Sequence, residues 1–125
     1  LWQALTDGAL CAQYDFLNST TKVTTEKGGR LDQYSTDGGL IVGGEIIDLV
    51  PLSRLEITFE PHWGEQPGAV SRYVYAIEQP GEACCLTISH YDLVEDIEDV
   101  AQGWSMQMAS LKSFLETGTG LRFAA

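Results

Sequence analysis

The sequence predicts an α+β domain in which one long C-terminal helix lies against one face of an antiparallel β-sheet. Residues 99–118 form the only long segment with helical periodicity, whereas apolar and polar residues alternate over short segments between residues 22 and 91. Glycine and proline residues separate those short segments, as turns require. With 125 residues and 44% hydrophobic content, we expect one domain, residues 1–125, with a core of its own.

The C-terminal segment has the pattern of an amphipathic helix. Its apolar residues recur at spacings of four, four, three and four, which places one set on a single helical face: Val100, Trp104, Met108, Leu111 and Leu115. We expect Asp99 to be the N-cap and Gly118 to end the helix at the C′ position. A helix of ~18 residues is roughly 27 Å long, so it can cross a curved sheet and enclose a pocket.

Two short helices and about six strands are expected before this helix. Residues 1–7 and 9–14 favour helices on either side of a break at Asp7-Gly8. The periodicity then changes to two, and turn residues divide the expected strands as 22–26, 30–35, 40–50, 54–60, 70–79 and 83–91. We expect Gly43 and Gly44 to interrupt the third of these strands.

The charge balance excludes some classes of partner. Eighteen acidic residues against seven basic ones give a formal net charge of −11. Such a surface repels phosphate backbones and anionic headgroups, so we expect no binding to nucleic acid or to a membrane surface. No apolar run approaches the ~20 residues that span a bilayer, and the first residues lack the pattern of a signal peptide.

The three cysteines, Cys11, Cys84 and Cys85, show no CxxC spacing. If Cys84 and Cys85 lie in one strand, they point to opposite faces and do not pair easily. We interpret all three as small apolar residues of a reduced, cytoplasmic protein, the alternative being a metal or redox role. The sequence has no metal-ligand spacing, phosphate loop or nucleophile elbow, so we expect no metal and no cofactor.

Candidate ligand-binding residues lie on the strand faces that meet the long helix. We select Phe59, Tyr73, Tyr75, Ile88 and His90 on the strands, facing Trp104 and Met108 on the helix. The aliphatic members are typical core residues, whereas each tyrosine either orients a polar ligand group or bonds to the protein frame. Trp63, in a loop rich in proline and glycine, is a lid residue or a loop anchor.

His90 is the weak candidate for catalysis, because it is the one titratable side chain on that face that can act near neutral pH. A general base needs a second group that orients it. The alternative is a structural histidine with satisfied hydrogen bonds.

The back of the long helix is a second feature. Its residues Met106, Ala109, Ser110 and Ser113 are less polar than a solvated face should be. We expect a loop or a second subunit, as in a homodimer, to cover this side.

Several segments resemble the SRPBCC (START-like) superfamily, in particular the branch named for activators of the heat-shock-protein-90 ATPase. The segments are LWQALTD at 1–7, GEIIDLVP at 44–51 with RLEITF at 54–59, LTISH at 86–90, and Gly103-Trp104 with SLK and LETG at 110–118. The resemblance implies the helix-grip fold, a curved seven-stranded antiparallel sheet around a long C-terminal helix with a cavity between them. The family has a strand before the opening helix, whereas this sequence begins inside that helix, so we expect upstream residues to supply it. A missing strand would leave an unpaired edge and favour dimerisation.

Three functional hypotheses follow. The first is a binding domain for a small hydrophobic or amphipathic molecule, such as a lipid, held between sheet and helix. The second is an enzyme of the polyketide-cyclase or hydratase type that uses His90 and a tyrosine for proton transfer, as the resemblance suggests. The third is a regulator of a chaperone ATPase, although the eukaryotic namesakes carry an additional N-terminal domain that this sequence lacks.

Overall fold

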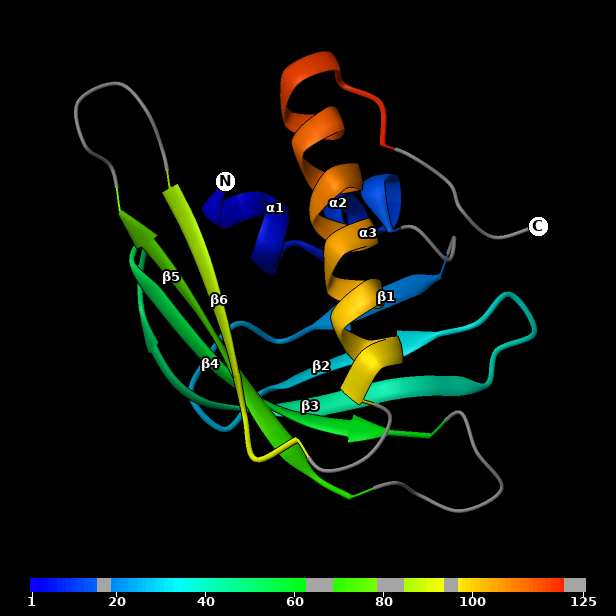
Figure 1. Ribbon diagram of the computed structural model, residues 1–125, viewed down its shortest axis with the longest axis vertical. Helices are drawn as coiled ribbons and strands as arrows, with labels where there is room; N and C mark the ends of the chain where they lie inside the picture. Colours follow the sequence, from blue (N-terminus) through cyan, green and yellow to red (C-terminus); the bar gives the residue numbers. More distant parts are fainter. Residues whose placement is uncertain (16–18, 63–68, 79–84, 94–96, 121–125) are drawn as a thin grey trace.

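The computed structural model describes residues 1–15, 19–62, 69–78, 85–93 and 97–120, and it confirms the α+β prediction (Figure 1). Two short helices come first, α1 (Trp2–Thr6) and α2 (Gly8–Tyr14). Six strands and a long helix follow, namely β1 (Thr20–Val23), β2 (Arg30–Tyr34), β3 (Leu40–Val50), β4 (Arg54–Pro61), β5 (Ser71–Glu78), β6 (Cys85–Tyr91) and α3 (Ile97–Thr117). None of the helices in the described part of the chain has the length and apolar character needed to cross a membrane.

The six described strands form one antiparallel sheet in which each strand pairs with its neighbour in the sequence. The register shifts between Gln33 and Tyr34 in β2, and again between Ile46 and Asp48 in β3. Such irregularities increase the local twist and bend of a strand. The sheet accordingly curves around α3, with α1 and α2 beside that helix (Figure 1).

The ends of α3 agree with the prediction at one terminus only. Gly118 has φ of +82° and its N–H donates to Phe114 O at 2.8 Å, so the predicted C′ position is confirmed. The predicted N-cap at Asp99 is wrong, because the helix already includes Ile97 and Glu98. Neither Ile97 nor Glu98 prevents helical backbone, so the helix includes both residues. Glu98 and Asp99 place negative charge in the first turn, where the helix dipole favours it.

The predicted interruption of β3 at Gly43 and Gly44 is also wrong, since the strand runs without a break from Leu40 to Val50. A Cβ atom on Gly44 would lie 2.1 Å from the Thr58 carbonyl oxygen, and one on Gly43 would lie 2.4 Å from the Asp32 carboxylate. The two glycines therefore permit close approach of neighbouring groups inside the sheet. Glycine that marks such an approach has the same sequence pattern as glycine at a turn.

The core lies between the concave face of the sheet and the helices. Alternate residues of β4 are buried, including Leu55, Ile57 and Phe59. The residues between them carry charge on the other face, where Glu56 pairs with Arg54 at 2.8 Å and with Arg72 at 3.3 Å. This alternation is what gives the sheet one apolar and one solvated face.

Elements of the same chain cover part of the weakly polar side of α3. Ser110 is fully buried and its hydroxyl donates to the carbonyl oxygen of Tyr14 in α2. The Phe114 ring packs on the Tyr14 ring with centroids 5.8 Å apart. Ser113 Oγ donates to Thr119 O at 2.8 Å. The small polar residues on this side therefore join the helix to α2 and to the segment that follows the helix.

Candidate functional site

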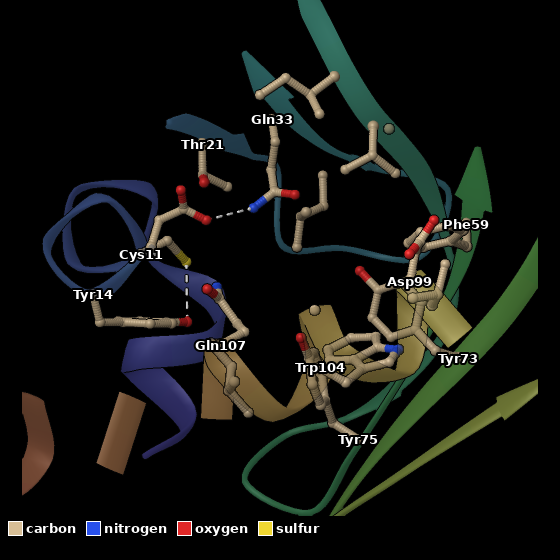
Figure 2. Close-up of a pocket in the computed structure, with 18 residues that line it drawn as sticks. Cys11, Tyr14, Thr21, Gln33, Phe59, Tyr73, Tyr75, Asp99, Trp104 and Gln107 are labelled. Atoms are coloured by element: carbon tan, nitrogen blue, oxygen red, sulfur yellow. Dashed lines mark hydrogen bonds between the residues drawn. The ribbon is translucent and has the colours of Figure 1, made fainter. Parts of the chain in front are cut away.

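A cavity of about 380 Å³ lies between the concave face of the sheet, α2 and α3 (Figure 2). The wall is formed by the N-terminal helical segment, the sheet and α3. The helical segment contributes Leu5, Cys11, Tyr14 and Asp15, and α3 contributes Asp99, Val100, Gly103, Trp104 and Gln107. The sheet contributes Thr21, Leu31, Gln33, Ile41, Val42, Gly43, Phe59, Tyr73 and Tyr75. The volume lies within the range of protein sites for small molecules.

Aromatic side chains form one wall of the cavity. The Trp104 ring lies edge-on to Tyr73 and Tyr75, with centroid distances of 5.0 and 5.9 Å. Tyr73 also meets Tyr75 at 5.4 Å and Phe59 at 6.2 Å in T-shaped contacts. Edge-to-face packing favours defined orientations of these rings. Burial raises the pKa of both tyrosines above their usual value of 10.0, which keeps their hydroxyl groups uncharged.

His90 shares the sheet face of Tyr73, its register partner, but it is not among the residues of the cavity wall. Trp104 Nε1 donates to His90 Nδ1 at 3.1 Å, and His90 Nε2 lies 2.7 Å from Ser71 Oγ. Because an indole N–H only donates, Nδ1 carries no proton, and in the neutral ring Nε2–H donates to Ser71. Burial lowers the pKa of His90 from its usual 6.5, which also favours the neutral ring.

The structure brings together half of the predicted ligand-binding residues. Phe59, Tyr73, Tyr75 and Trp104 all contribute to the cavity wall. Ile88, His90 and Met108 are outside it: Ile88 and Met108 pack against the core, and His90 contacts Trp104 and Ser71. Trp63 lies outside the described residues. On α3 the wall residues are spaced as Val100, Gly103, Trp104 and Gln107, so the helical stripe that faces the cavity is rotated from the apolar stripe.

Sequence reasoning missed the polar end of the cavity. Asp15 follows α2 and is 1% exposed, and its Oδ2 accepts hydrogen bonds from Ser19 N at 2.8 Å and from Ser19 Oγ at 2.7 Å. Gln33 Nε2 donates to Asp15 Oδ1 at 3.1 Å. Asp15, Thr21 and Gln33 come from three different elements, so no local pattern joins them. The one available signal was the period of two in β2, which places Gln33 on the same face as Leu31.

Two further polar groups of the wall are bound within the protein. Tyr14 donates from its hydroxyl to Ala4 O at 2.7 Å, and Cys11 Sγ lies 3.3 Å from the same carbonyl oxygen. Burial raises the pKa of the Cys11 thiol to about 11 and that of Tyr14 well above its usual value. A thiol with so high a pKa is a poor nucleophile at neutral pH.

The carboxyl groups in the described part of the cavity wall have no basic side chain beside them in that wall. Asp15 and Asp99 lie in this wall, which contains no lysine, arginine or histidine. Nor do the described residues include a cluster of three or more His, Cys, Asp or Glu side chains that could hold a metal ion. The arrangement can enclose an apolar molecule and form a few directed hydrogen bonds with it.

The curved sheet, the long helix across it and the cavity between them define a helix-grip domain. The family described as Activator of Hsp90 ATPase homolog 1-like protein matches residues 1–116. The chain belongs to this family, a branch of the SRPBCC superfamily, as its sequence motifs predicted. No curated protein matches the chain significantly.

Solved structures show the same fold. CalU16 from Micromonospora echinospora superimposes with a TM-score of 0.73 at 20% identity, over 94% of this chain and 68% of that one. SSP2350 from Staphylococcus saprophyticus superimposes with a TM-score of 0.71 at 17% identity, over 99% of this chain and 86% of that one. The AHSA1 protein SPO3351 from Silicibacter pomeroyi superimposes with a TM-score of 0.69 at 18% identity, over 94% of this chain and 88% of that one. At these identities the similarity concerns the fold.

Proposed function

We propose that this protein binds a small hydrophobic or amphipathic molecule between its sheet and α3, without transforming it. The observation that carries the proposal is the cavity of about 380 Å³ with its aromatic wall. Close-packed protein cores contain few voids larger than a water molecule, so a space of this size inside a domain of 125 residues is typical of a binding site. Bound ligand would gain free energy from burial of its apolar surface against Phe59, Tyr73 and Trp104.

The contacts of His90 give the enzyme hypothesis less support. A general base must reach a proton on the substrate. Both ring nitrogens of His90 already have partners, Trp104 and Ser71, and the ring lies outside the cavity wall. Trp104 therefore separates the histidine from the space where a ligand would lie, and we assign His90 the role of orienting the indole.

The proposal is tested by titration with N-phenyl-1-naphthylamine, an uncharged dye that fluoresces in apolar surroundings. We expect saturable binding of one dye per chain. Val42→Phe places a larger side chain in the cavity wall and should weaken binding at least ~10-fold, since bound dye and the phenyl ring compete for the same space. Val50→Phe is the matched control, because Val50 lies on the same strand but is 49% exposed.

Circular dichroism establishes that both variants are folded. No saturable dye binding by the wild type, or equal binding by the Val42→Phe variant, would contradict the proposal. A second measurement is mass spectrometry of an organic extract from protein purified without denaturation, in which we expect an apolar molecule that the Val42→Phe variant no longer carries.

The location proposed from the sequence is the cytoplasm. Among the described cysteines, Cys11 is buried and Cys85 is exposed, and both are free thiols. Free, exposed cysteine is typical of reducing compartments.

A further inference from the structure

The hydroxyl group of Tyr73 is an unpaired polar group that opens onto the cavity. Tyr73 is 7% exposed, and its hydroxyl forms no hydrogen bond with a described residue. Among the described residues, Thr21 Oγ1 is the one side-chain oxygen or nitrogen atom that is both enclosed and unpaired. The Tyr73 oxygen is therefore not enclosed, and in Figure 2 it points toward the interior of the cavity.

Other buried hydroxyl groups near the cavity have partners within the protein. The Tyr14 hydroxyl donates to Ala4 O at 2.7 Å, and Ser19 Oγ donates to Asp15 Oδ2 at 2.7 Å. Most buried polar groups in native proteins are paired, and an unpaired one is unfavourable in free energy. An unpaired hydroxyl at a cavity is therefore a point where a bound molecule gains a hydrogen bond without breaking one inside the protein.

The direction of this hydroxyl follows from the packing of its ring. The Tyr73 ring meets Trp104, Tyr75 and Phe59 in T-shaped contacts, with centroid distances of 5.0, 5.4 and 6.2 Å. Such contacts favour a defined orientation of the ring, and the C–O bond of a tyrosine lies along the ring axis. The hydroxyl is thus presented to the cavity before a ligand arrives.

The protonation of Tyr73 determines what it offers. Burial raises the pKa of Tyr73 above its usual value of 10.0, so the hydroxyl keeps its proton at neutral pH and donates a hydrogen bond. The complementary ligand group is therefore an acceptor. A ligand ammonium group has donors only, so it would leave the proton of the tyrosine unpaired.

The charges of the wall select among acceptors. Asp15 and Asp99 are acidic, and the described wall contains no lysine, arginine or histidine. A carboxylate placed in the cavity would lose its hydration without gaining a cationic partner, which is costly. A carbonyl oxygen of a ketone or an ester accepts a hydrogen bond, carries no charge and brings no donor that needs a partner of its own.

We propose that the cavity binds uncharged ligands that carry a carbonyl oxygen, as in a ketone or an ester, and that the Tyr73 hydroxyl donates a hydrogen bond to this oxygen. The apolar body of the ligand lies against the wall beside it, to which Phe59 and Trp104 contribute. One hydroxyl and one carbonyl group form this contact, so it requires no second polar group of the wall. This inference rests on the proposed function and adds the chemical class of the ligand.

The first test compares 2-acetylnaphthalene with 2-isopropenylnaphthalene, in which a CH₂ group replaces the carbonyl oxygen. Displacement of N-phenyl-1-naphthylamine gives the dissociation constants of both ligands for the wild type and for Tyr73→Phe. We expect Tyr73→Phe to weaken binding of the ketone roughly 3- to 10-fold, the loss of about one hydrogen bond, and not to weaken binding of the hydrocarbon. Two ligands compared across two proteins isolate the contact between hydroxyl and carbonyl.

Tyr91→Phe is the matched control, because Tyr91 is 43% exposed and is not part of the described cavity wall. It should leave both dissociation constants unchanged, and circular dichroism establishes that both variants are folded. Equal weakening of the two ligands by Tyr73→Phe, or no weakening of the ketone, would overturn this inference and leave the proposed function standing. Absence of dye binding by the wild type would overturn both.

Two further measurements examine the hydrogen bond and the charge separately. The ¹³C-enriched carbonyl carbon of bound 2-acetylnaphthalene should resonate further downfield in the wild type than in Tyr73→Phe, because a hydrogen bond withdraws electron density from that carbon. The carboxylate 2-naphthoate should bind the wild type at least ~10-fold more weakly than the ketone at neutral pH. Equal chemical shifts in the two proteins, or equal or tighter binding of 2-naphthoate, would overturn the assignment.

Discussion

Tyr14 and Tyr73 are both buried beside the cavity, but their hydroxyl groups have different surroundings. The Tyr14 hydroxyl donates to Ala4 O at 2.7 Å and so connects α2 to α1. The Tyr73 hydroxyl forms no hydrogen bond with any described residue, and it points toward the cavity in Figure 2. Two residues of one type therefore have different roles, one in the frame and one at the site.

This difference predicts that removal of the two hydroxyl groups changes the stability by different amounts. Tyr14→Phe should lower the free energy of unfolding by about 1–2 kcal/mol, because it removes a buried hydrogen bond. Tyr73→Phe should change it by less than about 0.5 kcal/mol, since no bond to the protein is lost. Urea denaturation of the ligand-free proteins measures both values. A larger loss for Tyr73→Phe than for Tyr14→Phe would contradict the assignment of roles.

The pair formed by His90 and Trp104 predicts a pH dependence of stability. The pKa of His90 is lowered from 6.5 by burial, so the unfolded chain takes up a proton at a higher pH than the native protein. The stabilisation is therefore complete above pH 6.5 and is lost as the pH falls through the native pKa. Protonation also places a hydrogen on Nδ1, where Trp104 donates.

His90→Asn is the informative variant, because its side-chain oxygen can still accept from Trp104 and does not titrate. We expect the free energy of unfolding of the wild type to decrease between about pH 7.5 and about pH 5.5, and the decrease to be smaller in the variant. Denaturation at a series of pH values measures this. Equal slopes in both proteins would show that His90 does not titrate differently in the folded state.

At the level of elements, the junction of β3 with β4 depends on the absence of a side chain. Gly44 lies inside β3, and a Cβ atom there would come within 2.6 Å of Ile57 Cγ2 as well as 2.1 Å of Thr58 O. A side chain at this position would therefore collide with both the backbone and a buried side chain of β4. Gly39, in the turn before β3, has a different environment, where a Cβ would lie 3.2 Å from the Asp37 side chain.

Gly44→Ala should therefore destabilise the fold by about 1–3 kcal/mol, as overpacking of a core does. Gly39→Ala is the matched control and should cost less than about 0.5 kcal/mol, because its nearest neighbour is the end of an exposed side chain and not the backbone of a paired strand. Thermal or urea denaturation compares the two. If both substitutions cost the same, close approach at Gly44 is not what requires glycine.

At the level of the whole molecule, two electrostatic effects oppose each other. The net charge of −11 produces repulsion that disfavours the compact state. Ion pairs on the outer face of the sheet, such as Arg30 with Glu60 at 3.0 Å, favour it. The arginine side chains in these pairs are 37–45% exposed, so each pair contributes little. Repulsion should therefore be the larger effect.

Salt tests which effect dominates. Raising NaCl from about 0.1 M to about 1 M shortens the screening length from about 10 Å to about 3 Å, which weakens long-range repulsion more than contacts between neighbours. We expect the thermal midpoint to rise with salt. A midpoint that falls would show that the ion pairs outweigh the repulsion, and the Arg30→Met variant should then be markedly less stable than the wild type.

The order of elements and the aromatic wall were predictable from the sequence because they depend on local periodicity. Alternation in β4 and β5 places Phe59, Tyr73 and Tyr75 on one face, and helical spacing directs Trp104 toward them. The family motifs gave the helix-grip arrangement in the same way, since their order along the chain is preserved. Neither the periodicity nor the family motifs depend on which residues far apart in the chain come into contact.

The polar end of the cavity was decided by the tertiary structure alone. Thr21 and Gln33 meet because of the β1–β2 register, and Asp15 reaches Gln33 because α2 packs beside β1. His90 was likewise assigned to the cavity by alternation, but Trp104 covers it and takes its Nδ1. The sequence by itself determined the fold and the apolar wall, because burial follows a periodic pattern. Only the tertiary structure determined the polar groups, because hydrogen-bond partners depend on contacts between residues far apart in the chain.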